Sequence, residues 1–153
     1  MKETKELKVS AIKSGTVIDH IPADSLFAVI NILKLDKLSS QITFGTNLES
    51  KRLGKKAIIK LADVHFAQDE INKIALIAPD AKLNIIEDYK VTEKKVVEVP
   101  DRIVGIVKCV NPKCITNNEE MTTKFEVINK TNIALRCEYC EKITDKLHLK
   151  LVE

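Results

Sequence analysis

The sequence predicts an α+β fold in two parts, a larger N-terminal domain and a small β-rich domain built around cysteines. Three observations lead to this prediction. The chain has 153 residues, the length of one ordinary domain or two small ones. Apolar residues recur at strand and helix spacing along the first two thirds of the chain. All four cysteines lie in the last third.

The chain begins with extended structure. Apolar and polar residues alternate over residues 7–12, which predicts a strand. Ser14 and Gly15 are typical turn residues, and residues 16–21 return to an extended pattern.

A helix is predicted over residues 22–35. Pro22 suits the first turn of a helix, where its missing N–H has no partner to lose. Leu26, Ile30 and Leu33 then recur at i, i+4 and i+7, so that one face of the helix is apolar.

Two more strands, a second helix and a last strand follow. Residues 41–48 and 57–62 are predicted to pair as a hairpin around a turn at residues 51–55. Acidic residues start the second helix at residue 68, and Pro79 stops it. Residues 82–91 are predicted to form the last strand.

This order, β-α-β-β-α-β, is that of the ferredoxin-like split βαβ arrangement, in which two helices cover one sheet face and leave the other for a ligand or partner. The charged residues 92–102 predict a linker, which divides the chain into domains at 1–98 and 99–153. Short β-like runs follow at 103–108, 124–128, 133–136 and 146–152.

The cysteines form two short-spaced pairs, Cys109-x4-Cys114 and Cys137-x2-Cys140. Two such pairs on two loops can place four thiolates at the corners of a tetrahedron, the arrangement that Zn²⁺ prefers. We therefore expect one structural zinc ion, since four thiolates leave no open coordination position. The alternatives are four unrelated buried thiols, or a redox Cys-x-x-Cys site.

Composition argues against several classes of function. The net charge is +3 and aromatic residues make up 4% of the chain, which is weak support for nucleic-acid binding. With zinc and four thiolates, the nine basic and eight acidic side chains of residues 101–153 give a charge of about −1. No membrane span, signal peptide or catalytic motif is visible, so we expect a cytoplasmic protein that is not an enzyme.

Several charged residues of the N-terminal domain could form a binding site. Asp19 and His20 lie at a predicted strand end, Lys56 and Lys60 belong to the hairpin, and Lys94 follows the last strand. Lysines suit phosphates, and a carboxylate suits sugar hydroxyls. Spacing alone leaves the alternative that each is a solvated surface charge.

Residues 15–22, Gly-Thr-Val-Ile-Asp-His-Ile-Pro, together with the cysteine spacing resemble one family closely. The sequence is similar to the regulatory chain of aspartate carbamoyltransferase, and the likeness continues through Asn84–Tyr89 and Cys137–Lys142. Two positions, Glu6 and Lys113, depart from some members of the family.

The resemblance implies an allosteric N-terminal domain and a C-terminal zinc domain that docks on the catalytic chain. The first would bind CTP as inhibitor and ATP as activator, and the chain would form regulatory dimers that bridge catalytic trimers. Pyrimidine biosynthesis would be the process controlled.

The resemblance also implies roles for individual residues. The effector site would comprise a base-binding group, a ribose-binding group and a triphosphate-binding group, with Lys60 near base and ribose and Lys56 adding charge. The base would be bound by Ile12, Tyr89, Asn84 and Ile86, the ribose by Val17 and Asp19, and the phosphates by His20, Val91 and Lys94. Asn111 and Glu141 would contact the catalytic chain.

Overall fold

The computed structural model describes residues 11–152, so most of the predicted strand at 7–12, and Glu6, lie outside the described residues. The chain divides into two compact units between Glu98 and Val99. Each unit is mainly β-structure with short helices, which confirms the predicted α+β class. None of the helices in the described part is both long enough and apolar enough to cross a bilayer.

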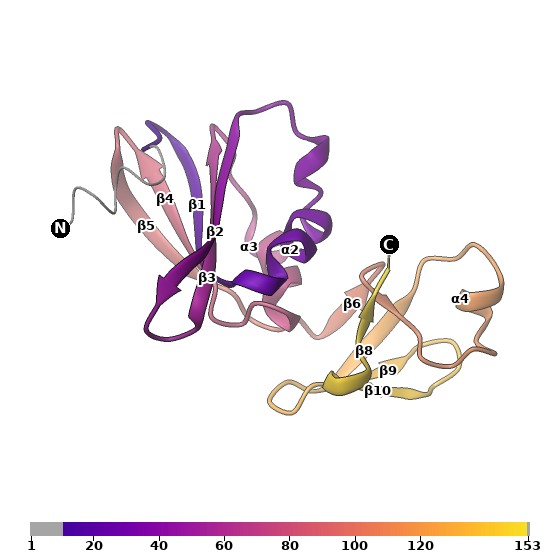
Figure 1. Ribbon diagram of the computed structural model, residues 1–153. Helices are drawn as coiled ribbons and strands as arrows, with labels where there is room; N and C mark the ends of the chain where they lie inside the picture. The colour runs from indigo at the N-terminus through magenta and orange to yellow at the C-terminus, as the bar shows by residue number, and fades with distance from the viewer. Residues whose placement is uncertain (1–10, 153) are drawn as a thin grey trace. The chain divides into compact units, whose positions relative to one another are not determined.

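The first unit contains a five-stranded antiparallel sheet with the strand order β2-β3-β1-β4-β5 (Figure 1). Strand β3 lies between β1 and β2, which is the split arrangement expected from the element order. The strands are β1 (Gly15–Pro22), β2 (Ile42–Ser50), β3 (Gly54–Ala62), β4 (Lys82–Glu87) and β5 (Lys90–Val96).

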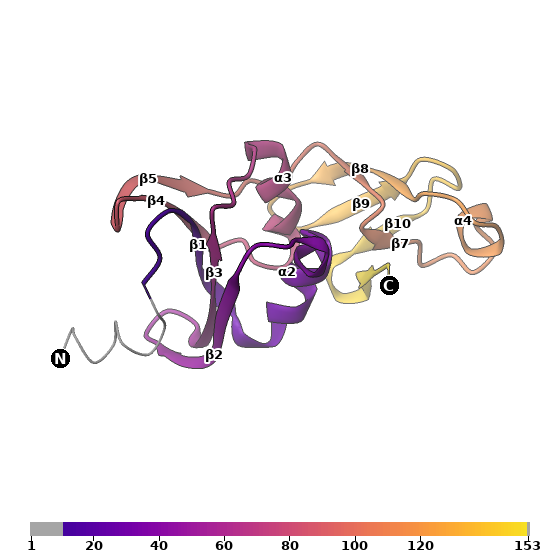
Figure 2. The same cartoon turned by 90° about the horizontal axis from the view of Figure 1, so that it is seen from above.

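Helices cover one face of this sheet (Figures 1 and 2). The core between them is formed by fully buried sheet residues such as Ile18, Ile59 and Leu83, against Leu26 and Ile74 from the helical segments. The helical segments are η1 (Ala23–Ser25), α2 (Leu26–Ile32), η2 (Leu35–Lys37), α3 (Gln68–Asn72) and η3 (Lys73–Leu76).

The predicted start of the unit needs two corrections. Residues 11 and 12 are not in a strand, and Gly15 belongs to β1 rather than to a turn. At Gly15, with φ 137°, a Cβ would lie 2.0 Å from the carbonyl oxygen of Leu61, so only glycine allows this close pairing of β1 with β3. The predicted helix over 22–35 is shorter at both ends. Pro22 is the last residue of β1 and α2 begins only at Leu26, while Lys34, just beyond the end of α2, adopts a left-handed conformation with φ 54° that stops the helix.

The predicted strand at 82–91 is in fact a hairpin. Asp88 and Tyr89 both have positive φ, 49° and 66°, as a two-residue type I′ turn requires. The second strand, β5, takes up residues 92–96 of the segment predicted as a linker. An Asn-Gly or Asp-Gly pair would have signalled this turn, but Asp-Tyr does not.

The second unit holds a four-stranded sheet, β10-β9-β8-β6, and a two-stranded ribbon, β7-β11. Phe125, Leu135 and Ile103 are buried at its centre. Helix α4 and strand β10 were not predicted, since both are too short to show a period. The elements are β6 (Arg102–Val104), β7 (Val107–Lys108), α4 (Ile115–Asn118), β8 (Lys124–Asn129), β9 (Ala134–Cys137), β10 (Ile143–Asp145), η4 (Lys146–His148) and β11 (Lys150–Leu151).

Candidate metal centre and effector site

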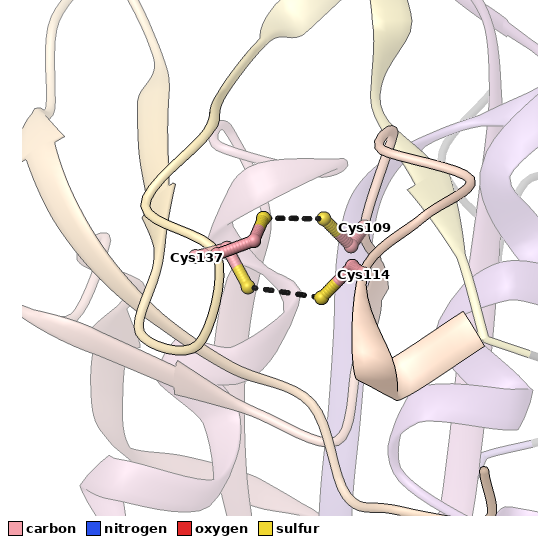
Figure 3. A group of neighbouring side chains, drawn as sticks. Cys109, Cys114 and Cys137 are labelled. Atoms are coloured by element: carbon pink, nitrogen blue, oxygen red, sulfur yellow. Dashed lines mark hydrogen bonds between the residues drawn. The ribbon is translucent and has the colours of Figure 1, made fainter. Parts of the chain in front are cut away.

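The four cysteines lie together in the second unit. All four sulfur atoms are within 4.8 Å of one another. Across the two loops, Sγ of Cys109 is 3.6 Å from Sγ of Cys140, and Sγ of Cys114 is 3.7 Å from Sγ of Cys137 (Figure 3). These are contacts between reduced thiols, because a disulfide bond is only ~2.05 Å long.

Backbone hydrogen bonds shape the first cysteine loop, between β7 and α4. The N–H of Cys114 donates to the carbonyl of Asn111 at 3.0 Å, and the N–H of Lys113 donates to Oδ1 of Asn111 at 3.0 Å. This tight turn brings Cys109 and Cys114 to the same side of the loop, as a metal-binding knuckle requires.

The second loop joins β9 to β10 and is equally tight. The N–H of Glu141 donates to the carbonyl of Cys137 at 2.9 Å, and the N–H of Cys137 donates to the carbonyl of Lys142 at 3.0 Å. Glu141 adopts a left-handed φ of 65°, which allows the chain to turn back beneath Cys140.

Burial and hydrogen bonds set the acidity of the thiols. Burial raises the pKa of Cys109 to about 12, against the effect of a hydrogen bond from the backbone of Asn111. Burial also raises the pKa of Cys137. At Cys140 burial again acts upward, but hydrogen bonds from the Lys142 backbone and the Asn111 side chain lower the pKa to about 7. A cation that binds the buried thiols of Cys109 and Cys137 must therefore displace their protons.

Sequence reasoning missed two residues that support this centre. Nδ2 of Asn117 donates to the carbonyls of Cys109 and Asn111 at 3.0 and 2.7 Å. Nδ2 of Asn118 donates to the carbonyls of Pro112 and Cys114 at 3.1 and 2.8 Å. The Asn-Asn pair three and four residues after the second cysteine, at the end of α4, was the available signal, because asparagine amides often bind nearby backbone carbonyls.

In the first unit, many of the residues expected in the effector site share the sheet face opposite the helices. Residues directly opposite on neighbouring strands point to the same face. Val17 is opposite Lys60 of β3 and opposite Asn84 of β4, and Asn84 is opposite Lys94 of β5. These four residues therefore form one row across β3, β1, β4 and β5, which we call the open-face row.

Next to the open-face row is a charged cluster at the end of β1. Nζ of Lys56 forms an ion pair with Oδ1 of Asp19 at 3.0 Å, and both side chains are about four-fifths buried, with relative exposures of 22% and 19%. The N–H of His20 donates to Oδ1 of Asp19 at 2.6 Å. Nδ1 of His20 is buried, lies 3.6 Å from Oδ2 of Asp19, and makes no hydrogen bond with the described residues.

The remaining expected residues lie around this face. Ile86 follows Asn84 by two positions on β4, is buried, and is opposite Val91 of β5. Tyr89 is exposed at the hairpin turn, where its N–H donates to the carbonyl of Lys13 at 2.9 Å. Ile12 lines a hollow of about 240 Å³ beside β2 and β3. Burial lowers the pKa of Lys60, so an anion placed there would favour its charged form.

The two expected docking residues lie on the cysteine loops. Asn111 is half-buried in the first loop, and Glu141 is exposed in the second. A partner that bound both would therefore contact the surface over the cysteine cluster.

Comparison with known proteins finds a match to the same family for each of the two units. A family model for the aspartate carbamoyltransferase regulatory chain, allosteric domain, matches residues 7–98, and one for the metal binding domain of that chain matches residues 101–150. The chain is similar to proteins named "Aspartate carbamoyltransferase regulatory chain" from three organisms. They are from Phocaeicola vulgatus (56% identity over 99% of both chains), Bacteroides fragilis (57%, over 93% of this chain and 94% of the relative) and Pyrococcus abyssi (54%, over 92% and 94%).

Proposed function

The chain belongs to the family of aspartate carbamoyltransferase regulatory chains, and on that premise we propose that it is the non-catalytic subunit that places the catalytic chain under nucleotide control. It binds CTP as inhibitor and ATP as activator on the open sheet face, and so regulates pyrimidine biosynthesis. The observation that carries this proposal is the open-face row with the adjacent Asp19 cluster. Four reduced cysteines suit the reducing cytoplasm as its location.

The chemistry of the open face suits a nucleoside triphosphate. Lys60 and Lys94, with Lys56 nearby, supply point charges for phosphates, and the carboxylate of Asp19 can accept hydrogen bonds from ribose hydroxyls. The apolar Ile86, the amide of Asn84 and the hairpin turn at Tyr89 provide surfaces for a base, and Val17 would contact the ribose beside Asp19. Nδ1 of His20 is buried and has no hydrogen-bond partner among the described residues, so a phosphate oxygen could serve as its acceptor.

We assign the metal as one structural zinc ion. A tetrahedral zinc with Zn–S bonds of ~2.3 Å places its sulfur ligands ~3.8 Å apart. The separations of 3.6 and 3.7 Å are close to that edge length, and all four sulfur atoms lie within 4.8 Å of one another. Cys109, Cys114, Cys137 and Cys140 would hold the ion, which would join the two loops and fix Asn111 and Glu141 for docking on the catalytic chain.

Self-association as regulatory dimers is supported by the β2 edge of the sheet. Residues 42–48 of this edge strand carry no charge, whereas the opposite edge, β5, carries lysines and a glutamate that discourage pairing. Phe44 of β2 packs edge-on against Phe27 of α2, with ring centroids 6.2 Å apart, yet both are exposed, at 47% and 71%. A second copy could cover this apolar edge with two-fold symmetry.

The dimer surface can be tested with Phe44→Lys. A lysine here removes apolar contact and places two like charges near the symmetry axis, so the dimer should dissociate at least tenfold more readily. Sedimentation equilibrium of the isolated, zinc-loaded chain measures this. Ile128→Lys, at an exposed aliphatic site in the second unit, is the control and should remain dimeric. Equal dimer stability in both variants would place the contact elsewhere.

The function as a whole is tested by mixing the chain with the catalytic chain of the same organism. The two should co-purify, and the assembled enzyme should be inhibited by CTP and activated by ATP. An assembly whose rate responds to neither nucleotide would contradict the proposal.

Two substitutions should separate effector binding from assembly. Lys60→Ala and Lys94→Ala each remove a charge-assisted contact, which is typically ~1.5–3 kcal/mol, so CTP and ATP affinity should fall about tenfold or more. Calorimetry measures the affinity. Both variants should still join the catalytic chain, because neither lysine lies in the metal-binding unit.

Lys37→Ala is the matched control for these substitutions. Lys37 is an exposed lysine of η2, in the helical part of the unit rather than in the sheet. Its removal should leave nucleotide affinity unchanged. If both Lys60→Ala and Lys94→Ala also bind CTP as tightly as the wild type, the effector site does not include the open-face row.

A further inference from the structure

The β7-β11 ribbon of the second unit pairs two like charges. Lys150 of β11 is directly opposite Lys108 of β7, and both side chains are exposed. Side chains in such positions have Cβ atoms only ~5 Å apart, so two ammonium groups there repel each other and weaken the ribbon. Among residues 11–152, no carboxylate forms an ion pair with either lysine.

Two open hollows flank this lysine pair. One has a volume of about 550 Å³ and the other about 510 Å³, and both are lined by Lys108, Asn117 and Lys150. Among the described residues, no aspartate or glutamate lines either hollow. We call the continuous surface formed by the two hollows and the lysine pair the ribbon groove. Within residues 11–152, no carboxylate lines this surface or forms an ion pair with its two lysines.

The walls of the first hollow are largely apolar, whereas those of the second are mixed. Val110, Pro112 and Leu147 line the first hollow, and the Leu147 side chain is 91% exposed. A small inorganic anion would gain no binding energy from apolar walls. A peptide segment with both acidic and apolar side chains would fill the groove and neutralise the charge of its two lysines. His148, which also lines the first hollow, would attract the partner's acidic side chain less than the lysines do, because its Nδ1 already lies 2.6 Å from Oδ1 of Asp145.

A buried polar atom lies beside the second hollow. Thr123 is only 6% exposed, and its Oγ1 is buried without a hydrogen-bond partner among the described residues. Thr123 lines the second hollow, so a polar group of a bound segment could satisfy the hydroxyl. This feature is independent of the lysine pair.

The ribbon groove is continuous with the cysteine loops. Cys109 and Pro112 line its first hollow, and Pro112 follows Asn111, one of the two expected docking residues. We propose that the groove is a further docking surface, which receives an acidic, partly apolar segment of the catalytic chain. This inference rests on the proposed function. The repulsion between Lys108 and Lys150 is relieved when the partner's carboxylates lie between them, so assembly gains speed and salt sensitivity.

Charge reversal of one lysine tests this proposal sharply. In Lys108→Glu, or in Lys150→Glu, the ribbon gains an attractive cross-strand pair, so the unit should be at least as stable as in the wild type. Docking should weaken nevertheless, with an association rate for the catalytic chain on the order of tenfold lower at low salt. Stopped-flow mixing of full-length zinc-loaded chain with catalytic trimers measures the rate, and thermal unfolding measures the stability.

Lys130→Glu is the matched control. It makes the same change of charge in the same unit, at an exposed turn where Lys130 pairs with Asp101 outside the groove. Its association rate should stay within about twofold of the wild-type rate, since a single exposed pair contributes little.

The outcomes separate the two proposals. If the wild type assembles and all three variants associate at the same rate, the ribbon groove is not a docking surface, although the proposed function survives. If the wild type does not assemble at all, the proposed function fails with it. Salt-dependent binding of the wild type to duplex DNA that only the groove variants lose, with assembly unchanged, would assign the groove to a nucleic acid and overturn the proposal.

Discussion

Replacement of Cys137 by alanine is expected to release the metal and unfold the second unit while the first unit stays folded. Cys137 is fully buried, its sulfur is 3.7 Å from that of Cys114, and its loss would leave only three of the four clustered thiols. In small domains zinc binding typically supplies ~10–16 kcal/mol, which is more than such a domain gains from its apolar core alone. The two units have separate cores, so the damage should not spread.

Metal analysis and hydrogen exchange measure this result. The wild type should contain one zinc per chain, and the variant none, with exchange protection lost only in the second unit. Tyr139→Phe is the control within the same loop, because it removes only a hydrogen bond of 3.4 Å to the carbonyl of Thr122. That control should keep its zinc. A Cys137→Ala protein that still joins the catalytic chain would contradict the structural role of the metal.

A four-residue insertion of glycine and serine after Glu98 is expected to abolish most of the CTP inhibition without affecting the nucleotide site or the metal site. The proposed nucleotide site and the docking surface lie in different units, so a signal must pass through the orientation of the units, through the dimer contact, or through both. Glu98 ends the first unit, where its N–H donates to Oδ1 of Asn72 at 3.0 Å. A flexible insert beyond this anchor should loosen the orientation of the units while both cores remain intact.

Enzyme assays of the assembled variant measure the response to CTP, while calorimetry and metal analysis verify nucleotide affinity and zinc content. The same insertion after Thr131, in the exposed turn between β8 and β9, is the control and should leave the inhibition intact. Undiminished inhibition in the Glu98 insertion would show that the orientation of the units is not part of the allosteric signal.

The sequence by itself determined the fold class, the sites of most strands and the four cysteines that cluster in the second unit. These features follow from local patterns: the alternation along residues 57–62, the end of the second helical segment before Pro79, and the two short cysteine spacings. The resemblance drawn from residues 15–22 and the cysteines is confirmed by the family comparison. Local patterns are read well because each depends only on residues within a few positions.

Short elements were harder to predict. The turn at Asp88 and Tyr89 contains no glycine, and the helix is stopped at Lys34 rather than at a glycine. Residue propensities therefore predicted neither the turn nor the helix end. Lys34 and Tyr89 both adopt a left-handed conformation that their residue type does not favour. Helix α4 is too short for a periodic pattern to be seen.

The tertiary structure alone decided which distant residues share a surface. Val17, Lys60 and Asn84 lie far apart along the chain, and the antiparallel register places them in one row. The opposition of Lys108 and Lys150 is equally invisible in the sequence, because it depends on the pairing of β7 with β11. Register reflects the packing of the whole core, since a slip of one residue would move every buried side chain to the solvent face.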